Sequence, residues 1–95
     1  MIESTTVFRK CSDARYRNIG GEGIVVRQTA GEVLVLNEVG VRVLDLLAKG
    51  GPVDSVVDAV AADYDVDAAT AERDVLAYAQ ELVEAGVIET LPAGP

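Results

Sequence analysis

Ninety-five residues make one domain, and because about half of them are apolar the chain can form a hydrophobic core. The chain has no His and a single Cys, which excludes a structural zinc site and an internal disulfide. Without His, a Ser or Cys nucleophile would lack its usual general base. We therefore expect no catalysis, cofactor or metal. No apolar run approaches the ~20 residues that span a membrane, so we expect a cytoplasmic protein without membrane contact.

The first half of the chain has the short, β-branched segments that are typical of strands. Residues 1–14 have no clear period and are expected to form a flexible arm, with a short strand near residues 6–9. Residues 16–19, 24–28 and 32–36 read as three strands, separated by tight connections that contain Gly. Short connections between neighbouring strands predict an antiparallel meander.

At Asn37 the period changes from two to 3.6, which predicts helices for the second half. Asn37 is a good N-cap for a first helix that ends at Gly50-Gly51 and whose apolar stripe is formed by Val39, Val43, Leu46 and Leu47. Pro52 is expected to open the second helix as its first residue, and Asp67 to cap a third helix that runs to about residue 85. Gly86 ends that helix, and the apolar pair after it is expected to return to the core.

This order of elements predicts an α+β fold of the winged helix-turn-helix type, with a three-stranded antiparallel sheet followed by three helices. We divide the chain into a flexible arm at 1–14, the folded domain at 15–90 and a flexible tail at 91–95.

The distribution of charge argues against a nucleic-acid partner. Residues 1–49 carry seven basic and six acidic residues, and residues 50–95 carry one basic residue, Arg73, against ten acidic ones. A winged helix that binds DNA needs Lys and Arg on its recognition helix, because contacts with phosphate supply most of the affinity. The third helix instead carries Glu72, Asp74, Glu81 and Glu84.

Two segments of the sequence resemble the PqqD-like family. Leu36-Asn37, Gly40, Val43, Leu46 and Leu47 resemble its "Leu-Asn, Gly, apolar helix" segment. Its C-terminal pattern is matched by Asp74-Val75, Tyr78, Leu82 and Gly86-Val87-Ile88. The resemblance covers roughly residues 16–89 and implies a small winged-helix domain that binds the leader of a ribosomally made precursor peptide. Such domains present the leader to a modifying enzyme, such as a leader peptidase, a cyclase or a radical enzyme.

The pathway is narrowed by one departure from the family pattern. Residues 27–31 stand where members of the pyrroloquinoline quinone pathway tend to carry a Pro-Glu-Gly-like turn. This difference, together with the length of a stand-alone domain, favours a protein of lasso-peptide type, which we expect to be a monomer.

The resemblance also implies a site, in which the leader adds as a strand beside the third strand and lies against the third helix. The expected peptide-binding residues are Val33, Leu34, Val35, Leu36, Arg73, Asp74, Leu76, Ala77 and Glu81. An open sheet edge is a template for an extended peptide, and acidic residues on the helix would attract a basic segment.

Each of these residues also has an ordinary structural interpretation. The two Val residues of the third strand could be buried on both faces, and Leu76 could widen the helical core. The charged residues, Arg73 included, could form a solvated face or pair locally, and Tyr78 is expected in the core. Helical spacing leaves open which flank of the third helix lines the cleft.

A second interpretation is an acyl or peptidyl carrier protein. Asp54-Ser55-Val56 is similar to the Asp-Ser-Leu site of carriers, with phosphopantetheine on Ser55. Carriers place a long helix well before that Ser, whereas this chain has predicted strands there.

Overall fold

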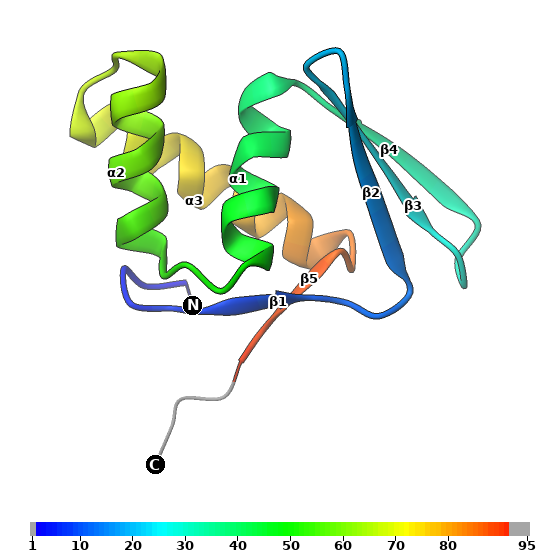
Figure 1. Ribbon diagram of the computed structural model, residues 1–95. Helices are drawn as coiled ribbons and strands as arrows, with labels where there is room; N and C mark the ends of the chain where they lie inside the picture. The colour runs from blue at the N-terminus through cyan, green and yellow to red at the C-terminus, as the bar shows by residue number, and fades with distance from the viewer. Residues whose placement is uncertain (1, 92–95) are drawn as a thin grey trace.

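A three-stranded sheet and three helices form the two sides of the fold, and a pair of short strands runs beneath the helices (Figure 1). The computed structural model describes residues 2–91. The strands are β1 (Phe8–Lys10), β2 (Ala14–Ile19), β3 (Glu22–Arg27), β4 (Glu32–Leu36) and β5 (Ile88–Thr90), and the helices are α1 (Glu38–Ala48), α2 (Val53–Tyr64) and α3 (Ala68–Glu84). The predicted antiparallel meander, in the order β2-β3-β4, and the three helices after it are confirmed.

A two-residue turn determines the register between β2 and β3. Gly20 and Gly21 both have positive φ, at 60° and 88°, which is the backbone of a two-residue hairpin turn that other residues rarely adopt. That turn fixes the pairing of Ile19 with Glu22, and all further pairs of β2 and β3 follow from it. One face of the resulting sheet buries Ala14 and Val25 in the core, and β3 and β4 contact α1.

The helices begin at polar caps, as the sequence predicts. The side-chain oxygen of Asn37 accepts a hydrogen bond from the backbone N–H of Gly40 at 2.8 Å, and Asp67 accepts one from Thr70 at 2.7 Å. Pro52 is the N-cap of α2, one position before the first helical residue where we expected it. None of the helices formed by residues 2–91 combines the length and apolar character of a transmembrane span.

The core lies between the helices and the inner face of the sheet. On α1 the structure buries Val41 and Leu44 in addition to the expected Val43 and Leu47, and leaves Val39 and Leu46 half-buried. The buried face of α1 is wider than a single stripe because this helix contacts β3 on one side and α2 and α3 on the other.

The N-terminal segment is part of the packed domain, which corrects the expected boundary at residue 15. Phe8 is only 1% exposed and belongs to the core, and β1 pairs antiparallel with β5. The backbone carbonyl of Ser4 accepts a hydrogen bond from Asp54 at 2.9 Å, at the start of α2. A short strand was expected near residues 6–9, which overlaps β1, but its pairing with β5 was not predicted, because three-residue strands are too short to show a period in the sequence.

The residue that follows β5 is also hydrogen-bonded to the N-terminal segment. The backbone N–H of Leu91 donates to the carbonyl of Val7 at 2.9 Å, so Leu91 is bonded to the domain. The remainder of the tail expected at 91–95, residues 92–95, lies outside the described residues.

Candidate functional site

The edge of β4 is open. Within residues 2–91, β4 pairs with β3 on one side and with no strand on the other. Val33 and Val35 are 63% and 62% exposed, whereas Leu34 and Leu36 are half-buried and face the helices. The interpretation of this strand as one buried on both faces is therefore wrong.

The register shows which backbone groups of β4 point to the open edge. Ile19 and Glu22 flank a two-residue turn, and residues in that position exchange both of their hydrogen bonds. Alternation along β3 then directs its even-numbered residues to β2 and its odd-numbered residues to β4. The even-numbered residues of β4 receive the bonds from β3, so Val33 and Val35 direct their N–H and C=O groups to the open edge.

A hollow of about 520 Å³ lies where the end of β4 meets α3. It is lined by Asn37 and Val39 from the start of α1, and by Asp74, Ala77, Tyr78 and Glu81 from α3. We call this hollow the α3 cleft. The hydroxyl of Tyr78 donates a hydrogen bond to the Asn37 side-chain oxygen at 2.9 Å, which holds the two walls of the cleft together.

Gly40 determines how closely these walls approach. A Cβ atom at this position would lie 3.0 Å from the Tyr78 ring and 3.3 Å from the Cβ of Leu36. An Ala at this position would press on the Tyr78 ring, which would have to move by a few tenths of an ångström. The Gly of the "Leu-Asn, Gly" segment thus has a packing role, because it allows the Tyr78 ring of α3 to lie directly against the β4–α1 junction.

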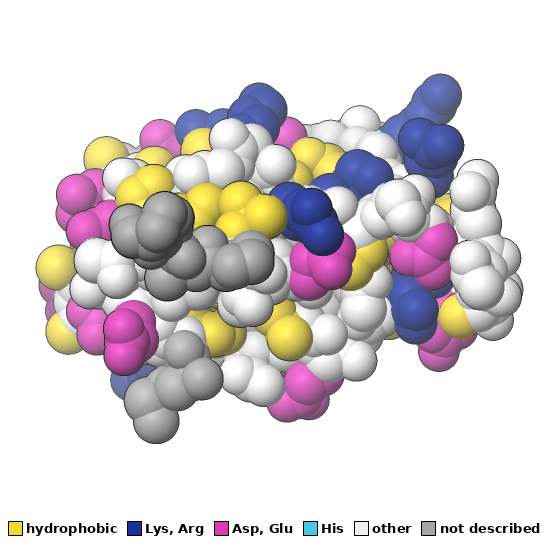
Figure 2. Space-filling model, turned by 90° about the horizontal axis from the view of Figure 1, so that it is seen from below, with side chains coloured by type: hydrophobic (Ala, Val, Ile, Leu, Met, Phe, Trp, Pro, Cys, Tyr) yellow, Lys and Arg dark blue, Asp and Glu magenta, His cyan; other side chains and the backbone are white. Residues whose placement is uncertain are grey.

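The α3 cleft is acidic. Asp74 is half-buried and Glu81 is exposed, and neither forms an ion pair with another of the residues 2–91. Their charges are therefore available to a ligand in the cleft. Figure 2 shows that most of the Lys and Arg side chains visible from below lie over the sheet end of the molecule.

Seven of the nine expected site residues come together. The four β4 residues form the open edge, and Asp74, Ala77 and Glu81 line the cleft beside the end of that strand. Leu76 does not join them, since it lines a separate hollow with Val53 and Val57. Arg73 is exposed on α3 and does not line the cleft. The flank of α3 that faces the end of β4 is therefore the one that carries Asp74.

Sequence reasoning missed three residues of the cleft. Asn37 was assigned only to capping, Val39 only to the apolar stripe of α1, and Tyr78 to the core. Tyr78 is in fact half-buried, with its ring against Gly40 and its hydroxyl on Asn37. The occurrence of Asn37, Gly40 and Tyr78 in the two matched motifs was a signal that could have placed them together.

The surroundings of Ser55 differ from those expected of a carrier site. Ser55 is exposed in the first turn of α2, where its N–H donates to the Asp54 carboxylate at 2.8 Å. In residues 2–54, the elements before it are four strands and the 11-residue α1. The long preceding helix of a carrier is not found there.

The geometry defines a small winged-helix domain whose sheet edge opens beside a helix-lined cleft, a class suited to take up an extended peptide. Residues 22–88 match the family model of coenzyme PQQ synthesis protein D (PqqD), and the chain therefore belongs to this family. The resemblance read from the two sequence motifs is confirmed.

Two solved structures share the fold over nearly their whole length. TbiB1 in complex with the TbiA(beta) leader peptide is 27% identical, with a TM-score of 0.80 over 88% of this chain and 98% of that one. A lasso peptide synthetase B1 complexed with the leader peptide is 25% identical, with a TM-score of 0.77 over 90% and 98%. No curated protein sequence matches the chain.

Proposed function

We propose that this chain binds the leader region of a ribosomally made precursor peptide, and delivers it to a modifying enzyme of lasso-peptide type biosynthesis. The observation that carries the proposal is the position of the open β4 edge, with the outward backbone groups of Val33 and Val35, directly beside the α3 cleft. Membership of the PqqD family and the two leader-bound relatives support it.

In the proposed complex the leader lies antiparallel or parallel to β4 as a fourth strand. The N–H and C=O groups of Val33 and Val35 offer up to four backbone hydrogen bonds, each worth about 0.5–1.5 kcal/mol net. Ordering a disordered leader costs about 2–5 kcal/mol, so backbone pairing alone is close to break-even. Side-chain anchors in the cleft must supply the surplus affinity.

The α3 cleft is suited to choose among leaders. Ala77 leaves space at the centre of the wall, and Asp74 and Glu81 place carboxylates on either side of it. Apolar leader side chains would bury themselves against Val39 and Ala77, and a Lys or Arg would approach the acidic pair. Exposed charges of this kind contribute little affinity and act mainly on association rate and specificity.

The function itself is non-catalytic in this proposal. By holding the leader, the domain raises the local concentration of the precursor at a leader peptidase, cyclase or radical enzyme. The β4 edge is occupied by one peptide at a time, so each chain would bind one leader.

The test is an NMR titration of ¹⁵N-labelled protein with the leader of each small precursor peptide encoded beside this chain, with a scrambled leader as the control. We expect saturable shifts of the amide signals at residues 32–37 and 74–81, and none with the scrambled peptide. Saturable shifts confined to the hollow of Val53 and Leu76 would contradict the site, and no binding of any leader would contradict the function.

A further inference from the structure

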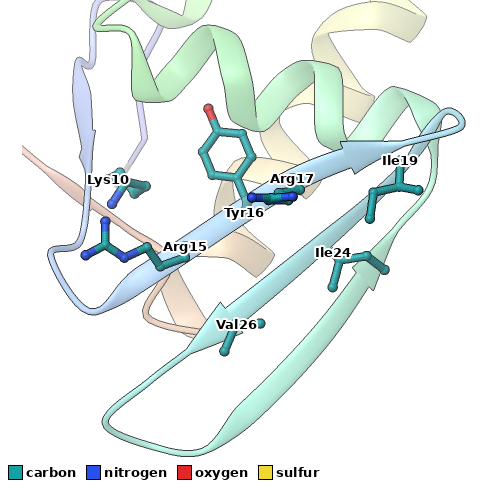
Figure 3. A pocket seen from close by; sticks show the side chains of 7 residues that line it. All are labelled: Lys10, Arg15, Tyr16, Arg17, Ile19, Ile24 and Val26. Carbon is teal, nitrogen blue, oxygen red and sulfur yellow. The ribbon is translucent and has the colours of Figure 1, made fainter.

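The outer face of the three-stranded sheet is uncovered and apolar. Alternation places Arg15, Arg17 and Ile19 of β2, Glu22, Ile24 and Val26 of β3, and Val33 and Val35 of β4 on the side that faces away from α1. We call this surface the outer sheet face, and Figure 3 shows several of its side chains standing on the ribbon. In residues 2–91 no helix or strand packs on it, since α1 lies on the opposite face (Figure 1).

The exposure of this face is unusual for the molecule. Among residues 2–91, six large apolar residues are exposed, and four of these lie here: Ile19, Val26, Val33 and Val35. A contiguous apolar patch with a polar rim marks an interaction surface more often than a chance exposure. Ile19, Ile24 and Val26 also line a hollow of about 400 Å³ at the β2 side, together with Lys10, Arg15 and Arg17 (Figure 3).

The rim of the outer sheet face is basic and unpaired. Elsewhere in the described chain, Arg9, Arg27, Arg42 and Lys49 each form an ion pair with a carboxylate. Arg15 and Arg17 form none with any of the residues 2–91, although the protein as a whole carries a net charge of −8. Two unpaired guanidinium groups at the edge of an apolar surface can form ion pairs across an interface, so we expect carboxylates on the molecule that covers it.

This charge also argues against a second copy of the chain as the occupant. Glu22 is the one acidic residue among the outward-facing positions of the three strands. Two copies joined through this face would bring four unpaired arginines into one interface with only two carboxylates to meet them. An apolar surface with an acidic rim on a different protein fits the face better.

We infer that the outer sheet face is a docking surface for the modifying enzyme, which binds through an apolar patch rimmed by Asp and Glu. The inference rests on the proposed function, because it supplies the contact through which a captured leader is delivered. The surface shares Val33 and Val35 with the leader site, but the leader would pair with their outward backbone groups at the β4 edge and lie in the α3 cleft, whereas the enzyme would contact their side chains on the outer sheet face. Leader and enzyme therefore bind at the same time.

The size of the face sets the strength of the contact. Strands about 4.8 Å apart and residues about 3.4 Å apart give a sheet face of roughly 10 by 20 Å. This is smaller than the ~800 Å² per partner of a standard stable interface. We therefore expect weak, transient docking, which is typical of small interfaces.

The test measures binding of the full chain to each modifying enzyme encoded beside it, purified singly, by isothermal titration calorimetry. Ile19→Thr with Val26→Thr removes apolar contacts but keeps β-branched residues in the strands. Val66→Thr is the control, because Val66 and Val26 are both 37% exposed and Val66 lies away from the sheet. Arg15→Gln with Arg17→Gln removes the basic rim. Its charge-matched control is Arg42→Gln in α1 with Lys49→Gln at the C-cap of that helix.

We expect the apolar pair to weaken binding of one enzyme by on the order of tenfold or more. The Arg15 and Arg17 pair should weaken it several-fold and flatten its dependence on salt. Neither control should change it, and circular dichroism should show every variant folded. The inference would be overturned if none of the enzymes binds the wild type, or if all variants bind as well as the wild type.

Two further measurements keep this result separate from the proposed function. Leader affinity, measured on the same variants, should not change, and a parallel loss would overturn the inference by assigning the face to the leader site. Self-association that the apolar variants abolish would overturn it in favour of a second copy. If the face variants lose enzyme binding while no leader binds the wild type, the inference stands and the proposed function fails.

Discussion

Asn37 and Tyr78 are joined by a hydrogen bond of 2.9 Å that connects the end of β4 to the middle of α3. The same Asn37 oxygen accepts the N–H of Gly40 and so caps α1. One amide therefore fixes three elements, and the walls of the α3 cleft keep their spacing through it.

Asn37 should contribute more to the free energy of unfolding than the Tyr78 hydroxyl. Tyr78→Phe removes one hydrogen bond and should lower the free energy of unfolding by about 0.5–1.5 kcal/mol. Asn37→Ala removes that bond and the cap as well, and should cost about 1–3 kcal/mol. Urea denaturation followed by circular dichroism measures both, and an equal loss in the two variants would show that the cap contributes nothing.

Proline substitutions test the register of β4. Val35→Pro removes an N–H that points to the open edge, so the variant should fold and lose leader binding by tenfold or more. Leu34→Pro removes an N–H that bonds to β3 and should unfold the sheet. The amide spectrum of each variant reads out folding before any titration. A folded Leu34→Pro protein beside an unfolded Val35→Pro protein would mean that the assignment of outward groups is reversed.

Charge reversal on the two flanks of α3 tests which one meets the leader. Asp74→Lys and Glu72→Lys change the net charge equally, but Asp74 lines the α3 cleft and Glu72 lines the hollow of Leu76. For a leader with a basic segment we expect Asp74→Lys to weaken binding several-fold, most strongly at low salt, and Glu72→Lys to leave it nearly unchanged. The opposite ranking in a calorimetric titration would move the site to the other flank.

The contact between Tyr16 and Asp45 predicts a dependence of stability on alkaline pH. The Tyr16 hydroxyl donates to the Asp45 carboxylate at 2.9 Å. Burial, then this hydrogen bond and the negative charge raise the pKa of Tyr16 from 10.0 to about 12. The protonated hydroxyl therefore stabilises the fold below pH 10, and that contribution is lost as the pH rises towards 12.

The measurement is the ultraviolet absorbance of the tyrosines as the pH is raised. The last step of phenolate formation, near pH 12, should vanish in Tyr16→Phe. Unfolding in urea should become less sensitive to pH between 10 and 12 in Tyr16→Phe. Retention of the last step in that variant would assign it to another tyrosine.

The packing of the sheet on α1 depends on Gly23. A Cβ atom there would lie 2.6 Å from the Cβ of Val41, so Gly23→Ala should destabilise the fold by about 1–3 kcal/mol. Val41→Ala opens the space, so the double variant should lose less than the sum of the two single losses. Urea denaturation of the four proteins gives the coupling, and strict additivity would show that Gly23 and Val41 do not meet.

The sequence was sufficient to predict the elements with strong periodicity. The β2–β3–β4 meander and the three helices follow from alternating residues, Gly turns and polar caps, all of which act between near neighbours in the chain. The β1–β5 sheet was not predicted, because its three-residue strands derive their stability from tertiary packing. The signal available in the sequence was Phe8 itself, one of four aromatic residues, which the structure buries in the core.

The site was predictable only in part, for a geometric reason. A helical wheel identifies the two flanks of α3 but does not show which of them faces the sheet. Leu76 of one flank and Asp74 of the other were therefore both predicted as site residues. Only the packing of Tyr78 against Gly40 fixes which flank meets β4. The exposure of Val33 and Val35 was similarly hidden, because an unbroken apolar run does not reveal which of its faces is covered.

The pairing of β1 with β5 has a practical consequence for transplanting this domain into another protein. The family match begins at residue 22 and stops at residue 88, yet the folded unit includes Phe8, which the core buries, and the whole of β2. A graft cut to the match would lose β1, β2 and two of the three residues of β5, and it would leave a second unpaired edge on β3. A functional graft must extend at least from Ser4 to Leu91, the outermost residues that hydrogen-bond across the domain.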